Sequence, residues 1–185
     1  KNVLSETGIE YINSIDNVEG HFYRKRYLLN SYADAISFLA KKEGLTYLYE
    51  AAQNDKINEQ IKPYMELLKD LLHERYHISK EELEQWQEIY RKRLQNDKIP
   101  RKLTTVARNL WEKLTVEERF VKPLIQLLEM KKDIAEGAKF IKKLIECGTE
   151  DEELSQIKEK LMEIWNVCPE GEILFNMIKK NFFIF

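Results

Sequence analysis

Lys25 and Asn30 lie five positions apart near the start of this chain, just before a segment with the apolar spacing of a long amphipathic helix. An α-helix completes a turn every ~3.6 residues, so side chains five positions apart point roughly 140° away from each other, about one and a half turns along the axis. An amine and a carboxamide with this spacing can reach a common cavity beside the start of the helix. The pair is therefore the first candidate for chemistry.

The composition limits the classes of partner. Charged residues make up 34% of the 185-residue chain and hydrophobic residues 43%, so we expect a real core beneath a densely charged surface. The formal net charge is −2, and binding to nucleic-acid phosphates favours a clear basic excess, so we expect no nucleic-acid partner. No apolar run approaches the roughly 20 residues that span a bilayer, so we expect no membrane partner.

Cys147 and Cys168 are the two cysteines. They lack a metal-binding spacing and have no histidine nearby, so we expect reduced thiols in a cytoplasmic protein. His73 and His77 are four positions apart, a spacing that can hold a metal on one helix face, but no third ligand is evident. The sequence therefore predicts no metal site.

Helical periodicity dominates the whole chain, and no segment shows the alternation typical of a β-strand. We predict an all-α fold, a multi-helix bundle, with residues 1–185 forming a single domain. The expected helices are a long one after Asn30 that stops at Gly44, then 48–53, 57–76, 80–94, a short one within 96–110, one behind Thr115, 134–147, one behind Thr149 and a last one from Pro169.

Capping boxes and prolines suggest where these helices begin. Ser79, Thr115 and Thr149 each have an acidic residue three positions later, which is the pattern of a capping box. Pro63 and Pro123 fall inside helical patterns, where a proline marks either a first turn or a kink, so both boundaries stay open.

The run of residues 24–33 carries a resemblance to a known family. It resembles the Lys-x-x-x-x-Asn-x-x-His pattern that opens the catalytic helical domain of the polyol-specific long-chain dehydrogenases, the family of mannitol-1-phosphate 5-dehydrogenase. Lys25 and Asn30 match this pattern, and Ala33 stands at the histidine position.

A second stretch, residues 105–124, is similar to the family segment Val-Gly-Arg-Asp-Pro-Leu-Arg-Lys-Leu-Ser-x-x-Glu-Arg-Leu-x-x-Pro. It departs from that segment at Leu110, where the family has proline, and at Glu112, where it has arginine. The similarity extends from residue 16 to about residue 142. The residues that match in place are Arg108, Lys113, Leu114, Glu118, Arg119 and Pro123.

The resemblance implies that this chain is the C-terminal, substrate-side domain of a mannitol dehydrogenase-like oxidoreductase. Family enzymes bind NAD through an N-terminal Rossmann domain, and nothing in residues 1–185 resembles that domain: there are only six glycines and no Gly-x-Gly-x-x-Gly motif. We expect either an excised domain or a naturally short protein. Without its cofactor half, the chain should neither bind NAD tightly nor turn over.

The resemblance also implies roles for four residues. Lys25 would take the hydroxyl proton as hydride leaves, and Asn30 would donate a hydrogen bond to the oxygen that gains charge. Arg108 and Lys113 would contact a polyol or polyol phosphate. A lysine base working near neutral pH requires burial or a nearby cation, and the flanking Arg24 and Arg26 are candidates for that cation.

Ala33 weighs against present activity, because a methyl group cannot orient a substrate oxygen. Tyr32 or Asp34 could take the place of the histidine, although Asp34 would bring a negative charge close to a developing alkoxide. The alternative function is a non-catalytic helical interaction module that kept the fold and lost the histidine. An unrelated bundle with chance motif matches is a third possibility.

Simpler interpretations of the individual residues also stay open. Lys25 can be a solvated charge, and Asn30 can be a helix cap. Glu112, Lys113 and Glu117 can form a surface charge network.

Overall fold

The structure of the chain, a computed structural model, describes residues 16–182. Helices joined by loops make up this part of the chain; no β-strand forms within it, although an isolated antiparallel bridge pairs Tyr47 with Lys102. The predicted all-α, multi-helix fold is confirmed. In chain order the elements are α1 (Val18–Arg24), the π-helix η2 (Lys25–Ser31), α2 (Tyr32–Lys41), α3 (Leu48–Gln53), α4 (Asp55–Tyr76), α5 (Lys80–Leu94), α6 (Leu103–Val106), α7 (Leu110–Lys113), α8 (Lys122–Glu129), α9 (Ala135–Gly148), α10 (Leu154–Trp165) and α11 (Pro169–Phe182).

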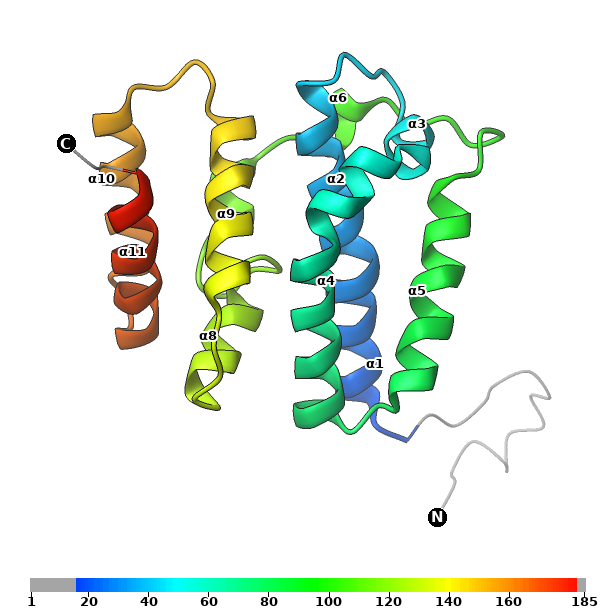
Figure 1. Ribbon diagram of the computed structural model, residues 1–185, viewed down its shortest axis with the longest axis horizontal. Helices are drawn as coiled ribbons and strands as arrows, with labels where there is room; N and C mark the ends of the chain where they lie inside the picture. Colours follow the sequence, from blue (N-terminus) through cyan, green and yellow to red (C-terminus); the bar gives the residue numbers. More distant parts are fainter. Residues whose placement is uncertain (1–15, 183–185) are drawn as a thin grey trace, which may run out of the picture.

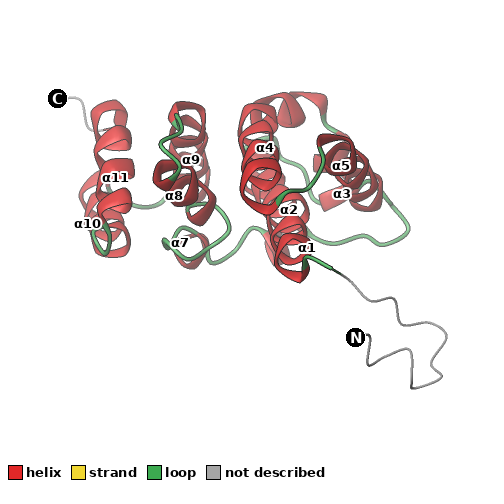
Figure 2. Ribbon diagram, turned by 90° about the horizontal axis from the view of Figure 1, so that it is seen from below, coloured by secondary structure: helices red, strands yellow, loops and turns green. Residues whose placement is uncertain are grey.

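The long helices stand side by side in a row (Figures 1 and 2). The pair α10 and α11 forms one end of the row, and α5 with α3 forms the other. Between them, α4 packs against α2 and η2 on one side and against α8 and α9 on the other. This arrangement buries α2 almost completely and fixes the start of the helix that carries the candidate residues.

Of the three predicted capping boxes, only the helix cap at Ser79 is confirmed, without the reciprocal bond from Glu82, and the two at Thr115 and Thr149 are wrong. The Ser79 hydroxyl accepts a hydrogen bond from the Glu82 N–H at 3.1 Å and caps α5. The Thr115 hydroxyl instead donates to the Glu112 carbonyl oxygen at 3.1 Å, and the Thr149 hydroxyl donates to the Ile145 carbonyl oxygen at 2.8 Å. Both threonines follow a helix, where a hydroxyl can bond back to a carbonyl three or four residues earlier.

The helices behind those two threonines begin later than predicted. Glu153 caps α10 with Gln156 as its capping-box partner. Pro123 lies in the first turn of α8, where a missing N–H costs no hydrogen bond. Pro63 lies inside α4, on an exposed position, and the helix continues through it.

The core contains a polar chain that joins three helices. The Tyr27 hydroxyl of η2 donates to Gln126 Oε1 of α8 at 2.9 Å, and Gln126 Nε2 donates to the Tyr76 hydroxyl of α4 at 2.7 Å. All three side chains are buried. Burial raises the pKa of Tyr27 and raises the pKa of Tyr76 to about 12, so both phenols keep their protons at neutral pH. The chain anchors η2 to the middle of the bundle.

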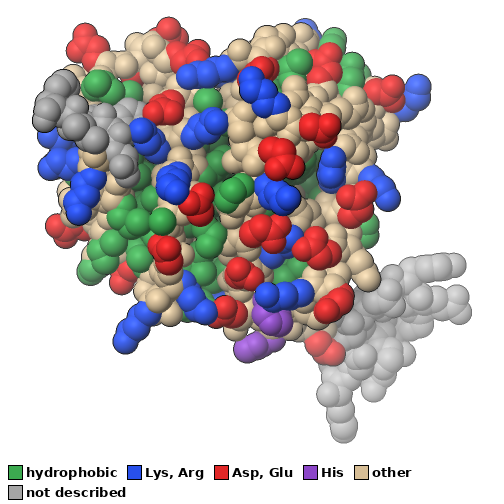
Figure 3. Space-filling model, viewed as in Figure 1, with side chains coloured by type: hydrophobic (Ala, Val, Ile, Leu, Met, Phe, Trp, Pro, Cys, Tyr) green, Lys and Arg blue, Asp and Glu red, His purple; other side chains and the backbone are tan. Residues whose placement is uncertain are grey.

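Lysine, arginine and acidic side chains interleave over most of the face drawn in Figure 3. This matches the densely charged surface that the composition predicts. In residues 16–182, no helix combines the length and the apolar character that crossing a bilayer requires.

Replacing Gln126 with leucine should lower the free energy of unfolding by about 1–3 kcal/mol, because the Tyr27 and Tyr76 hydroxyls then lose their buried partner. Urea denaturation measures the loss. The triple variant Tyr27→Phe, Gln126→Leu, Tyr76→Phe removes all the polar groups together and should recover part of it. A single variant as stable as the parent would show that the polar chain contributes nothing.

Candidate functional site

The candidate residues sit on η2, the π-helical segment Lys25–Ser31. In a π-helix the backbone N–H of each residue bonds the carbonyl five residues earlier, and such turns are frequent at functional sites. Because this turn is wider than an α-turn, side chains five residues apart point in more similar directions than they do in an α-helix. The α-helical separation of roughly 140° expected between Lys25 and Asn30 is wrong for this segment. The wider turn aligns the two side chains better than the sequence analysis expected.

Ser31 explains part of this geometry. Its side chain is fully buried, and its hydroxyl oxygen lies 3.1 Å from the carbonyl oxygens of both Arg26 and Arg119. Arg26 is five residues earlier, so a side-chain contact spans the same five-residue turn. Tyr27 and Leu28, buried on the same segment, pack it onto the core. The turn is thus held from inside the protein while Lys25 stays exposed.

Lys25 and Asn30 line one cavity of about 410 Å³, which we call the lysine cavity. This size is within the range of small-molecule sites. Its other lining residues are Leu29, Ala33, Leu48, Arg93, Leu94, Ile99 and Arg101.

A second cavity of about 510 Å³, which we call the aspartate cavity, adjoins the first. Asn30, Ala33 and Arg101 line both. Arg108 and Lys113 line the aspartate cavity, so the two adjoining cavities bring all four predicted site residues together. Its remaining lining residues are Asp34, Thr105, Val106, Asn109, Glu112, Glu118 and Arg119.

Buried Asp34 organises the aspartate cavity. Its Oδ1 accepts from Lys113 Nζ at 2.9 Å, and its Oδ2 accepts from Arg119 Nη1 at 2.9 Å. Lys113 Nζ also donates to the Val106 carbonyl oxygen at 2.8 Å. Two cations therefore balance the carboxylate, and the helix that carries Ala33 is tied to the segment around α7.

Glu118 completes this ionic cluster. It pairs with Arg26 at 2.8 Å and accepts from the Arg119 backbone N–H at 3.3 Å. Burial acts to raise the pKa of Glu118, but the charge of Arg26 and the contacts of Arg119 outweigh it, so the pKa is lowered.

Several expectations for this region are corrected. The Arg24 guanidinium lies 3.9 Å over the Trp86 ring and pairs with Glu82, so it does not face the lysine cavity. Arg26 is committed to Glu118. Neither flanking arginine therefore serves Lys25 as a neighbouring cation.

The residues on either side of Ala33 also point elsewhere. The Tyr32 hydroxyl donates to Asn58 of α4. Both carboxylate oxygens of Asp34 are occupied by cations. Neither Tyr32 nor Asp34 thus takes the place of the family histidine, and Ala33 places a methyl group where the two cavities meet.

The expected Glu112, Lys113 and Glu117 network does not form. Glu112 accepts from Asn109 at 2.8 Å, Lys113 binds Asp34, and Glu117 pairs with Lys122.

Arg93 and Arg101 are site residues that the sequence analysis missed. Arg101 stood out only as one of several basic residues in a loop after Pro100, and Arg93 ends a charged helix. The signal available in the sequence was that each arginine lies close to an apolar residue: Arg93 is next to Leu94, and Arg101 is two residues after Ile99.

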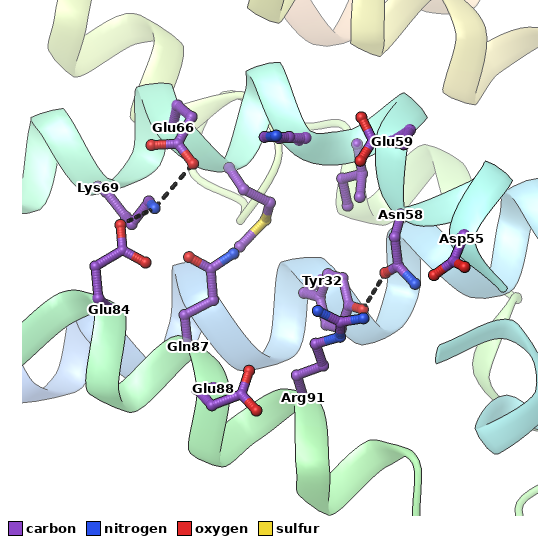
Figure 4. A pocket seen from close by; sticks show the side chains of 13 residues that line it. Tyr32, Asp55, Asn58, Glu59, Glu66, Lys69, Glu84, Gln87, Glu88 and Arg91 are labelled. Carbon is purple, nitrogen blue, oxygen red and sulfur yellow. Dashed lines mark hydrogen bonds and ion pairs between the residues drawn. The ribbon is translucent and has the colours of Figure 1, made fainter. Parts of the chain in front are cut away.

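Figure 4 shows a cavity of a different character between α4 and α5. It is lined by both signs of charge, and Lys69 lies between Glu66 and Glu84. Burial acts to lower the pKa of Lys69, but its hydrogen bonds to these two carboxylates raise it overall. Tyr32 and Asn58 close one end of the cavity through their hydrogen bond. Lys69 is paired with both carboxylates, whereas Gln87 Oε1 and Arg91 Nε are buried without a hydrogen-bond partner among the described residues. We place the functional site at the other two cavities because they contain all four predicted site residues.

Comparison with known proteins agrees with the motifs. The sequence model described as "Mannitol dehydrogenase C-terminal domain" matches residues 17–165, which include every residue of both cavities. The chain belongs to this family.

Curated relatives of this mannitol dehydrogenase C-terminal domain carry the name mannitol-1-phosphate 5-dehydrogenase. The protein of Caldanaerobacter subterraneus subsp. tengcongensis is 30% identical over 116 residues, which are 63% of this chain and 30% of the relative. The protein of Streptococcus pneumoniae serotype 4 is 29% identical over 115 residues, 62% of this chain and 30% of the relative. The chain thus matches less than a third of the length of these two relatives.

The two spaced histidines have local roles in this mannitol dehydrogenase domain. His73 Nδ1 lies 2.9 Å from the Ile78 carbonyl oxygen, and His77 takes a left-handed conformation at the end of α4. Within residues 16–182, no group of three or more His, Cys, Asp or Glu side chains is arranged to hold a metal ion.

Replacing Asp34 with asparagine should lower the free energy of unfolding by about 2–4 kcal/mol, because Lys113 and Arg119 then lose their buried counter-charge. Asp70→Asn is the matched control, since Asp70 is exposed and pairs with Lys80 at 3.4 Å; it should change stability by less than about 0.5 kcal/mol. Equally small losses for both variants, measured by urea denaturation, would contradict the role of Asp34.

The lowered pKa of Glu118 predicts a pH dependence. Its stabilisation is fully present above the ordinary pKa of 4.5 and is lost as the pH falls through the lower folded value. Glu118→Gln should therefore lower the free energy of unfolding at pH 7 by about 1 kcal/mol or less, and the difference should shrink as the pH falls below 4.5 and Glu118 becomes protonated. Glu163→Gln, at an exposed position, serves as the control. A difference that does not shrink as the pH is lowered through the acid range would show that charge is not its cause.

Proposed function

We propose that this chain is the substrate-side domain of an NAD-dependent oxidoreductase that acts on a sugar alcohol or a sugar-alcohol phosphate. The observation that carries the proposal is the convergence of Lys25 and Asn30 on one cavity in a chain of the mannitol dehydrogenase family. The relatives that match the chain are named for a polyol phosphate. The reaction oxidises a secondary alcohol or, in reverse, reduces the corresponding ketone.

Lys25 acts as the base in this proposal. Its amine, in the neutral form, takes the proton of the reacting hydroxyl, and it lies exposed on the cavity wall where that proton can pass to water. Asn30 Nδ2 donates a hydrogen bond to the same oxygen as its charge grows. The π-turn fixes both groups on one side of η2, so little reorganisation is needed when the substrate reacts.

NAD would supply the hydride acceptor when bound. The described residues form no strand and contain no glycine-rich phosphate loop, so they do not build the usual dinucleotide fold. What they offer is an exposed lysine at an open cavity, which fits the substrate side of such a site. We therefore propose a Rossmann domain N-terminal to these residues as the partner. The two free cysteines fit a cytoplasmic location.

Arg108 and Lys113 are the proposed contacts to the polyol. Arg108 lines the aspartate cavity, and its guanidinium forms no ion pair with the described residues. An ammonium has three donors, and Lys113 uses two of them on Asp34 and Val106. The third donor remains for a substrate hydroxyl. A polyol chain can thus extend from Lys25 across Ala33 into the aspartate cavity.

A second function, a non-catalytic helical interaction module, is favoured by one observation. Ala33 stands where the family pattern has histidine, at the junction of the two cavities, and no neighbour replaces the imidazole. A module of this kind would keep the fold and both cavities but show no turnover.

Turnover by the full-length gene product with NAD and a panel of hexitols and hexitol phosphates tests the proposal. Lys25→Ala should lower kcat by about 10²–10⁴-fold, which is the contribution of a general base. Lys179→Ala changes an exposed lysine on α11, away from both cavities, and should leave kcat unchanged.

Full activity in Lys25→Ala would remove Lys25 as the base. A folded full-length protein with no turnover on any hexitol or hexitol phosphate would favour the interaction module.

A further inference from the structure

Three cations from separate parts of the chain meet at the lysine cavity. Lys25 comes from η2, Arg93 from the last turn of α5, and Arg101 from the loop that follows. No carboxylate lines this cavity. Among the described residues, none of the three side chains forms an ion pair. The cavity therefore has the permanent positive charges of two guanidinium groups beside the Lys25 amine, and no carboxylate among its lining residues.

This lining differs from those of the two other cavities described above, both of which include carboxylates. Some exposed cations elsewhere also have acidic partners, as in Arg75 with Glu129 at 2.7 Å and Lys132 with Glu74 at 2.7 Å. The cavity in Figure 4 holds both signs of charge side by side. A chain with 30 basic and 32 acidic residues has carboxylates available for pairing. Because no carboxylate lines the lysine cavity, its guanidinium groups can bind the anionic group of a ligand.

Hydrogen bonds to α3 and the loop before it hold the backbone around Arg93 and Arg101 in place. The Leu48 N–H donates to the Arg101 carbonyl oxygen at 2.9 Å, and the Leu103 N–H donates to the Thr46 carbonyl oxygen at 2.9 Å. These bonds hold the Arg101 loop against α3.

The end of α5 is tied to the same helix. Gln95 Nε2 donates to the Ala52 carbonyl oxygen at 3.1 Å, and Gln53 Nε2 donates to the Gln95 carbonyl oxygen at 3.1 Å. Arg93 lies two residues before Gln95. Both arginines therefore start from backbone that is fixed before any ligand arrives, which lowers the entropy lost on binding.

Leu29, Leu48, Leu94 and Ile99 contribute apolar surface to the lining of this cavity. An apolar wall weakens the solvent screening of the like charges around it, so a bound anion gains more from them than it would on an open surface.

We propose that Arg93 and Arg101 bind the phosphate group of a sugar-alcohol phosphate. This inference rests on the proposed function and names the group that selects the substrate. Guanidinium groups match phosphate oxygens in a bidentate geometry, and two of them can share one dianion. Lys25, on the same cavity, is left for the reacting oxygen.

The aspartate cavity fits a phosphate less well. Glu112 and Glu118 line it, and their carboxylates repel a dianion. Lys113 is bound to Asp34 already. That cavity suits the neutral hydroxyls of the polyol.

Steady-state kinetics of the full-length protein test the assignment. Arg93→Ala and Arg101→Ala should each raise KM for a hexitol phosphate by about 10- to 100-fold, the loss expected for a charged hydrogen bond. KM for the unphosphorylated hexitol and for NAD should stay the same, and kcat should change little. Lys92→Ala, next to Arg93 and outside the cavity lining, is the matched control.

Two kinetic outcomes would overturn the proposal. Equal increases in KM for hexitol and hexitol phosphate would show that the arginines do not recognise phosphate. An increase in KM for NAD alone would place the nucleotide phosphates at these arginines instead.

A binding measurement on the 185-residue chain separates this proposal from the proposed function. NMR of the arginine Nε–Hε groups during titration with inorganic phosphate, at constant ionic strength, should show the Arg93 and Arg101 signals shifting together. Chloride at the same ionic strength should shift neither. If phosphate shifts neither signal, the site is wrong whatever the enzyme does. If both shift while Lys25→Ala keeps full activity, the phosphate site stands and the lysine-base mechanism fails.

Discussion

The π-turn of Lys25–Ser31 is the constraint on which the candidate site depends. Its inner side is buried: Tyr27 and Leu28 pack in the core, and Ser31 contacts the carbonyl oxygens of Arg26 and Arg119. Its outer side presents Lys25 and Asn30 to one cavity. In an ordinary α-turn, the side chains of Lys25 and Asn30 would point roughly 140° apart. The core therefore selects the backbone geometry that aligns the site.

Charge is arranged differently in the two adjoining cavities. In the aspartate cavity Asp34 pairs with Lys113 and Arg119, and the lining contains three carboxylates and four cations, so its charges are close to balanced. In the lysine cavity the cations have no carboxylate among the lining residues. A polyol phosphate has the complementary pattern, with neutral hydroxyls along its chain and a dianion at one end. Under the proposed function, the combined cavities would offer one surface to each part of such a substrate.

Ala33 lies between these two environments and marks the departure of this chain from the family pattern. Neither adjacent residue takes the place of the family histidine. The Tyr32 hydroxyl donates a hydrogen bond to Asn58, and the Asp34 carboxylate binds Lys113 and Arg119. Lys25 and Asn30 still line one cavity, so the chain keeps the two proposed catalytic groups without the histidine of the family pattern.

The sequence by itself determined the all-α fold and the limits of several helices, because local signals decide them: Ser79 caps α5, and Pro169 starts α11. It failed at Thr115 and Thr149, where a capping pattern follows a helix and the hydroxyl bonds backwards instead. The sequence also predicted that Lys25 and Asn30 reach one cavity, and both line it, but the prediction assumed an α-helix where the structure has a π-helix.

Only the tertiary structure decided which charges the site contains. Arg24 and Arg26, next to Lys25 in sequence, turn to Glu82 and Glu118. Arg93 and Arg101, about 70 residues away along the chain, take their place, because hydrogen bonds to α3 hold the end of α5 and its loop against the cavity. Distance along the chain does not predict such contacts, since they depend on how the helices pack.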